Sequence, residues 1–137
     1  MLPRPGTEHM GRILLVDDDP NVVDDNVVAL EASGHTVTTA STTSEARAAI
    51  RRETPDLVVL EAMLDGATAG FDLARSLASE KPALPLIMLS RIDEHLTAGE
   101  RDSQDHHDWM PVQRFMDKPV APEVLAYEVS HLVKVIH

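Results

Sequence analysis

The sequence contains no cysteine and few aromatic residues: of its 137 residues, one is Trp, one is Tyr and two are Phe. The absence of cysteine excludes disulfides, thiolate zinc sites and thiol nucleophiles, and it fits a protein of the reducing cytoplasm. No apolar run approaches the length of about 18 residues that a membrane-spanning helix requires, and the N-terminus lacks the apolar core of a signal peptide. We therefore expect a cytoplasmic protein without a membrane segment.

Basic residues are also scarce. The chain has 12 Lys and Arg against 23 Asp and Glu, which gives a formal net charge of −11. This acidity argues against a nucleic-acid partner, because affinity for nucleic acid comes largely from Lys and Arg that neutralise phosphates. The hydrophobic fraction of 43% is near that of globular proteins, and the length suits one domain with a full core.

The first eleven residues, 1–11, contain prolines and glycines but no apolar period, which predicts a flexible tail. The pair His9-Met10 is also typical of a cloning junction, with Met10 as the natural start, and both interpretations stay open. Residues 12–137 are predicted to form the folded domain.

Short apolar runs alternate with amphipathic helices along this domain. Strands are predicted at Ile13–Val16, Val37–Ala40, Leu57–Leu60, Leu86–Leu89 and Phe115–Met116. Three of them are four consecutive apolar residues, which is typical of parallel strands buried on both faces. Five strand–helix units therefore predict an α/β fold with an open, doubly wound parallel sheet.

Helix signals lie between these strands. Pro20 opens a helix that Gly34 closes, Thr42 and Glu45 have the spacing of a capping box, and Pro122 opens the last helix. A further helix is predicted over Phe71–Glu80. The polar stretch Asp93–Asp108 predicts a short, poorly held fourth helix and a long loop.

Polar residues follow the strands at their carboxyl ends. Asp17–Asp19 follow the first strand, Glu61 the third and Ser90 the fourth, and Lys118 follows the fifth. These ends meet at one edge of a parallel sheet. Because clustered carboxylates repel one another, we expect a divalent cation, a lysine counter-charge or both, and an all-oxygen ligand set favours Mg²⁺. Taken singly, Asp17–Asp19 could simply cap the first helix and Lys118 could be a surface residue, but together they favour a site.

Four motifs resemble the receiver domain of two-component response regulators, over about residues 11–137: Val16–Pro20, Pro55–Leu60, Met88–Ser90 and Asp117–Pro119. The resemblance implies a flavodoxin-like (β/α)5 receiver fold with strand order 2-1-3-4-5. It also implies a signalling module in a phosphorelay rather than an enzyme.

The resemblance further implies roles for seven residues. Asp17 and Asp18 match the acidic pair that holds Mg²⁺, and Met63 matches the residue that offers it a backbone carbonyl. Glu61 occupies the phosphoacceptor position, which also belongs to the metal site. Ser90 and Lys118 match the hydroxyl and the ammonium that contact the phosphoryl group, and Phe115 matches an aromatic switch. In this family the peptide bond that follows such a lysine is usually cis.

Position 61 departs from the family, whose phosphoacceptor is aspartate. Glutamate extends the carboxylate by one methylene, roughly 1.5 Å of bond length. Phosphoryl transfer depends on in-line positioning, so we expect Glu61 to be a poor acceptor and Mg²⁺ to bind weakly without turnover of phosphate. The glutamate is a natural degeneration, an engineered mimic or a working acceptor.

Two roles for Glu61 remain open. Its longer side chain could carry charge toward Ser90 and Lys118, as a partial substitute for a phosphate. Alternatively, it pairs with Lys118 and fixes the inactive state.

Two segments also depart from the family. The loop Met63–Gly70 is one residue longer than usual and has Asp65 where proline is common. The segment Ser90–Lys118 is also longer, as in a subset of stand-alone receivers, and it overlaps the family's common output face. Trp109 in this segment is interpreted as pinning the loop or as an interface anchor. Its histidines, His95, His106 and His107, predict a solvated loop or a transition-metal site.

We therefore predict a stand-alone receiver that signals by protein docking. Its expected partners are a histidine kinase or phosphotransfer protein and an unknown protein target, with no nucleic acid and no membrane. The last helix reaches the C-terminus, so no output domain is expected, and a monomer or weak homodimer is predicted. The alternative is a haloacid-dehalogenase-like Mg²⁺-dependent phosphohydrolase, since Asp17–Asp19 contain the required Asp-x-Asp spacing. Nucleotide binding is a third option, but the sequence contains no glycine-rich phosphate loop.

Overall fold

The structure is a computed structural model that describes residues 11–65, 68–90 and 112–136. Its elements follow the predicted alternation of strands and helices. In chain order they are β1 (Arg12–Val16), α1 (Pro20–Ala32), β2 (Thr36–Ala40), α2 (Thr43–Arg52), β3 (Leu57–Glu61), α3 (Ala69–Glu80), β4 (Leu86–Ser90), β5 (Arg114–Asp117) and α6 (Pro122–Ile136).

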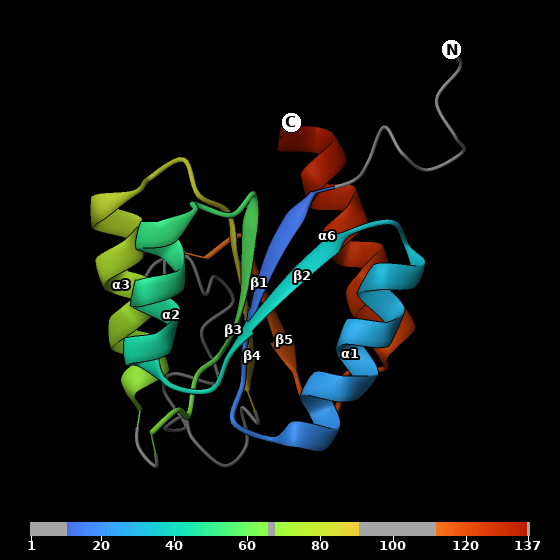
Figure 1. Ribbon diagram of the computed structural model, residues 1–137, viewed down its shortest axis with the longest axis horizontal. Helices are drawn as coiled ribbons and strands as arrows, with labels where there is room; N and C mark the ends of the chain where they lie inside the picture. Colours follow the sequence, from blue (N-terminus) through green and yellow to red (C-terminus); the bar gives the residue numbers. More distant parts are fainter. Residues whose placement is uncertain (1–10, 66–67, 91–111, 137) are drawn as a thin grey trace.

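The five strands form one parallel sheet in the order β2-β1-β3-β4-β5, which confirms the predicted fold class and strand order. Helices α1 and α6 cover one face of the sheet, and α2 and α3 cover the other (Figure 1). All residues of β3 and β4 are buried, because each of these central strands packs against helices on both faces. This double burial explains why their apolar runs show no alternation.

The strands extend slightly beyond their apolar runs. β3 includes Glu61 and β4 includes Ser90, whose register partners are Leu89 and Asp117 respectively. The polar residues at these strand ends still take part in the parallel pairing, which apolar patterning alone does not detect. The sheet therefore fixes the backbone of the two polar residues.

Local signals place two helix ends correctly. At the end of α1, Ser33 is the C-cap, and Gly34 follows it with a φ of 97° that favours glycine. At the start of α2, the side chain of Thr42 accepts a hydrogen bond from the backbone N–H of Glu45 at 3.1 Å. The Glu45 carboxylate reaches back to the N–H of Ser41 at 3.0 Å, one residue before the position that a capping box predicts.

Several predictions lie outside the described residues. These are the tail up to residue 10, the fourth helix and long loop, His95, His106, His107 and Trp109. Within the described ranges, no helix has the length and apolar character needed to cross a membrane.

A buried histidine joins three elements at the amino end of the sheet. His35 is 4% exposed; its Nδ1 accepts a hydrogen bond from the N–H of Gly11 at 3.0 Å, and its Nε2 lies 2.9 Å from the hydroxyl of Ser130 in α6. Since Nδ1 is an acceptor, Nε2 carries the proton of the neutral ring and donates it to Ser130. Burial lowers the pKa of His35 below its ordinary value.

This histidine predicts a loss of stability in mild acid. The unfolded chain binds a proton near the ordinary histidine pKa of about 6.5, before the folded protein does. The free energy of unfolding should therefore fall as the pH drops below that value, by at most about 1.4 kcal/mol per pH unit from this group. Urea titrations between pH 7.5 and pH 5.5 should show a smaller pH dependence for His35→Gln. An equal dependence in both proteins would contradict the prediction.

Candidate functional site

The polar residues predicted at the strand ends lie together at one edge of the sheet. Asp17 and Glu61 are buried at the ends of β1 and β3, and Ser90 is fully buried at the end of β4. Asp18 is exposed, and Lys118 follows β5. Residues far apart in the sequence thus form one acidic edge around a single lysine.

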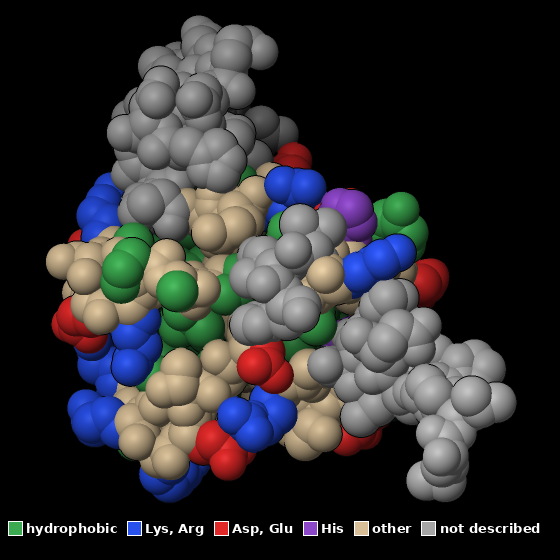
Figure 2. All heavy atoms as spheres, turned by 90° about the horizontal axis from the view of Figure 1, so that it is seen from above, with side chains coloured by type: hydrophobic (Ala, Val, Ile, Leu, Met, Phe, Trp, Pro, Cys, Tyr) green, Lys and Arg blue, Asp and Glu red, His purple; other side chains and the backbone are tan. Residues whose placement is uncertain are grey.

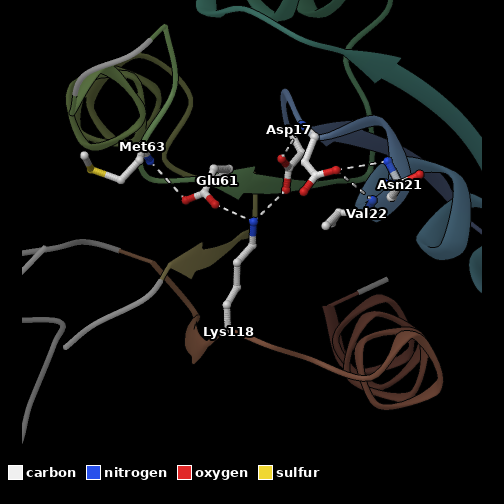
Figure 3. A network of polar contacts seen from close by, with 7 residues as sticks. Asp17, Asn21, Val22, Glu61, Met63 and Lys118 are labelled. Carbon is white, nitrogen blue, oxygen red and sulfur yellow. Dashed lines mark hydrogen bonds and ion pairs between the residues drawn. The ribbon is translucent and has the colours of Figure 1, made fainter. Parts of the chain in front are cut away.

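Lys118 lies between the two buried carboxylates (Figure 3). Its Nζ is 3.0 Å from Oδ2 of Asp17, and it forms a second ion pair with Oε1 of Glu61. The other carboxylate oxygens are also engaged: Oδ1 of Asp17 accepts from the N–H of Asp19, and Oε2 of Glu61 accepts from the N–H of Met63, each at 3.0 Å. All four oxygens of Asp17 and Glu61 therefore accept a hydrogen bond from the protein.

The charge balance favours a protonated lysine. Burial by itself lowers the pKa of Lys118, but the hydrogen bonds and charges of Glu61 and Asp17 outweigh burial, so the pKa is raised above its usual value. An ion pair this buried is weak evidence for net stability, because desolvation opposes the attraction. Removing one partner, however, would leave uncompensated charge in the interior.

Ser90 does not share in this network. Its Oγ is buried and has no hydrogen-bond partner among the described residues. The contacts of Glu61 go to Lys118 and Met63 rather than to Ser90. Of the two contacts considered for Glu61, the structure contains the ion pair with Lys118 and not an approach to Ser90.

The remaining predicted residues lie near the same edge. Phe115 in β5 is half-buried, and its ring centroid is 6.5 Å from that of Phe71 in α3. Met63, like Phe115, is partly buried against the apolar core that contains Phe71. The Lys118-Pro119 peptide bond is cis, as the resemblance implied.

The β3–α3 loop explains one departure from the family pattern. Asp65 has a φ of 59°, a left-handed conformation that the proline ring cannot adopt. Its Oδ2 accepts a hydrogen bond from the hydroxyl of Thr43 at 2.8 Å, which ties the loop to the start of α2. Asp65 therefore replaces proline as an anchor of a differently shaped loop.

A pocket of about 310 Å³ adjoins the acidic edge and contains one residue that the sequence reasoning missed. Asn26 of α1 lines this pocket, is 4% exposed, and its Oδ1 has no hydrogen-bond partner among the described residues. The helical spacing of Asn26 and Leu30, both buried, was the available signal, because it places an amide where an apolar side chain is expected.

The orphaned amide predicts a stabilising substitution. Asn26→Leu replaces a buried, unsatisfied carbonyl with an apolar group of similar size, so the free energy of unfolding should rise by about 1–2 kcal/mol. Urea denaturation measures the difference. Asn26→Asp is the contrasting variant, since it would bury a charge beside other carboxylates and should destabilise. A destabilised Asn26→Leu would show that the amide has a partner that this arrangement does not contain.

The carboxylates offer the oxygen chemistry that Mg²⁺ prefers, but their oxygens are already engaged. Over residues 11–65, 68–90 and 112–136 no group of three metal-ligating side chains has the geometry of a metal site. Lys118 occupies the space between Asp17 and Glu61. Lys118 therefore competes with Mg²⁺ for these two carboxylates.

Comparison with known families and proteins identifies similar chains. The sequence matches the family described as the response regulator receiver domain over residues 13–130. Protein PilH of Pseudomonas aeruginosa is 31% identical over 88% of this chain and 96% of its own length. The probable transcriptional regulatory protein TcrX of Mycobacterium tuberculosis is 41% identical over 66% of this chain, but this covers 41% of TcrX. This chain spans about half or less of the first curated relatives that it matches.

Solved structures agree on the fold. A CheY-like receiver domain protein from Methanospirillum hungatei superposes with a TM-score of 0.78 at 24% identity, covering 93% of this chain and 96% of that one. NtrX from Brucella abortus gives a TM-score of 0.70 at 28% identity, covering 92% of this chain and 28% of that one. These matches give the phosphohydrolase alternative no support.

Proposed function

Because the chain belongs to the response regulator receiver family, we propose that it is a receiver whose output does not depend on phosphorylation of position 61. Receiver domains act in two-component signalling, generally as non-enzymatic modules that meet histidine kinases or phosphotransfer proteins and generally bind Mg²⁺. In this chain, we infer that docking is kept and that phosphorylation of position 61 is lost.

The contacts of Glu61 carry the proposal. Both of its carboxylate oxygens are hydrogen-bonded, one to Lys118 and one to the N–H of Met63. An oxygen that attacks phosphorus must lie in line with the leaving group. The added methylene shifts the carboxylate away from the position of an aspartate, and the two hydrogen bonds hold it there. Glu61 therefore serves as the fixed anion of the lysine and not as an acceptor.

Mg²⁺ binds weakly in this proposal. A divalent cation must displace the ammonium of Lys118 from Asp17 and Glu61 before it gains their oxygens. Asp18, which is exposed, is the carboxylate of the predicted set nearest to solvent. The carbonyl of Met63 would complete the set, and Ser90 and Phe115 keep the positions of the phosphoryl-sensing and switch residues.

The output is protein docking by a receiver that acts alone, in the cytoplasm and as a monomer or weak dimer. The match to PilH supports the part of this proposal that the receiver acts alone, because the aligned region covers almost all of that protein. Residues 12–137 form the receiver, and Gly11 joins it through its hydrogen bond with His35.

Restoring aspartate at position 61 tests the proposal. The chain and its Glu61→Asp variant are incubated with Mg²⁺ and acetyl phosphate, and intact mass is measured. We expect no adduct on the unchanged chain and a gain of about 80 Da, one phosphoryl group, on the variant.

A matched control separates acceptor chemistry from general reactivity. Glu45→Asp makes the same change at an exposed helix start, and this variant should gain no phosphoryl adduct. A phosphoryl adduct on Glu61 of the unchanged chain would overturn the proposal.

A further inference from the structure

The face formed by α1 and α6 differs from the rest of the described surface in its exposed apolar side chains. Among the described residues, three large hydrophobic side chains are exposed: Val28 at 68%, Val124 at 49% and Tyr127 at 69%. All three belong to these two helices, which lie side by side on one face of the sheet (Figure 1). Single exposed apolar residues are ordinary, but their restriction to one pair of helices marks a surface.

A groove runs between the two helices beside these side chains. It has a volume of about 450 Å³, and small residues line it on both sides, including Ala29 and Ala32 of α1 and Ala126 of α6. Tyr127 lines the groove too, and its ring is stacked on that of His131 at a centroid distance of 6.4 Å and an angle of 6°. A ring held in this way is a rigid anchor that loses little freedom on binding.

Acidic residues border this α1–α6 surface. Asp24 and Asp25 lie one helical turn before Val28, Glu31 lies one turn after it, and α1 contains no basic residue. Glu123 lines the groove from α6. More of the basic side chains seen in this view lie on the side of α2 and α3 (Figure 2, left), and on α6 a lysine, Lys134, stands in the last turn, beyond the residues that line the groove.

We propose that the α1–α6 surface binds a basic amphipathic helix of a partner protein. The small residues of the groove admit the apolar ridge of such a helix, Tyr127 anchors it, and the acidic border pairs with its Lys and Arg. This inference rests on the proposal that the chain signals by docking, and it adds the surface and the chemistry of the partner.

The same charges disfavour two other occupants. A second copy of this chain would bring Asp24, Asp25 and Glu31 against their own like charges. An anionic lipid surface would also be repelled by these carboxylates. A positively charged helix is the occupant for which charge and shape agree.

The test uses the full chain and a synthetic probe. The probe is an amphipathic helix of Leu and Lys about 18 residues long, roughly five turns, and its counterpart has Glu in place of Lys. Titration of the isotope-labelled chain, followed by amide chemical shifts, should show changes confined to α1 and α6 with the Lys probe and none with the Glu probe. Tyr127→Ser should weaken binding at least about tenfold, as expected for a hot-spot residue.

A pair of charge reversals separates the surface from the overall charge. Asp25→Lys on α1 and Glu80→Lys on α3 change the net charge equally, and both residues are exposed. We expect the first to weaken binding at least about fivefold more than the second, because Asp25 borders the groove. Equal effects, shifts on another face, or no binding would overturn the surface. The mass measurement at position 61 is independent of this result, so the two proposals can fail separately.

Discussion

Gly70→Ala should lower the free energy of unfolding by about 3 kcal/mol or more, although alanine normally stabilises a helix relative to glycine. Gly70 lies in the first turn of α3, where a Cβ atom would be 2.1 Å from the carbonyl oxygen of Glu61 and 2.6 Å from that of Ala62. Its N–H donates to the same Ala62 carbonyl at 3.0 Å. The obstacle is backbone on both sides, so no side-chain rotation relieves the overlap.

The displacement would reach the acidic edge. Glu61 ends β3, and its side chain pairs with Lys118, so a shift of its carbonyl moves one of the two carboxylates that hold the lysine. We expect a lower urea midpoint, measured by circular dichroism, and a loss of cooperativity if α3 separates from the sheet.

Gly11→Ala is the matched control. Its Cβ would meet the two methyl groups of Val133 at 3.3 Å, a much milder approach than the 2.1 Å to backbone at position 70. The control should change stability by less than about 1 kcal/mol. Equal losses in both variants would show that the close approach of α3 to β3 is not the reason for glycine at position 70.

The sequence predicted the fold well because its signals are local or periodic. The four-residue apolar runs of β1, β3 and β4 indicate strands that are buried on both faces. Pro20, Gly34 and Pro122 mark helix ends. The topology then placed Asp17, Glu61 and Lys118 at one edge. What could be predicted was which elements form and which of their ends converge.

The sequence could not predict how the atoms of the site pair. Two roles for Glu61 were equally compatible with its position, and only distances distinguish an ion pair with Lys118 from an approach to Ser90. The conformation of Asp65 was also hidden, because a left-handed residue depends on the shape of its loop and not on a periodic pattern. Buried Asn26 was missed for a similar reason, since neighbouring valines supplied the apolar positions of the helix.

Lys118→Met should lower the free energy of unfolding, because it removes the counter-charge of two carboxylates. Met has a similar shape but no charge, so Asp17 and Glu61 would lie buried without a counter-charge. Removing one partner of such a pair costs about 3–5 kcal/mol. We expect this loss in urea denaturation at low ionic strength without divalent cations. Lys134→Met, on the exposed side of α6, is the control and should change stability by less than about 0.5 kcal/mol.

Mg²⁺ should distinguish the variant from the unchanged chain. In the unchanged chain, Lys118 already accounts for one oxygen of Asp17 and one of Glu61, so millimolar Mg²⁺ should shift the melting temperature little. In Lys118→Met the same two oxygens are released, and a cation that binds only the folded chain stabilises it by mass action. Melting temperatures with and without Mg²⁺ measure both effects, with Ca²⁺ as a second, larger cation.

A double variant decides whether charge is the cause. Glu61→Gln combined with Lys118→Met removes one carboxylate together with the ammonium, so it should recover part of the stability and lose part of the Mg²⁺ response. If Mg²⁺ instead stabilises the unchanged chain as strongly as Lys118→Met, the lysine does not compete with the metal. The weak binding proposed for Mg²⁺ would then be wrong, while the pairing of Lys118 with Glu61 would still account for the stability lost in the single variant.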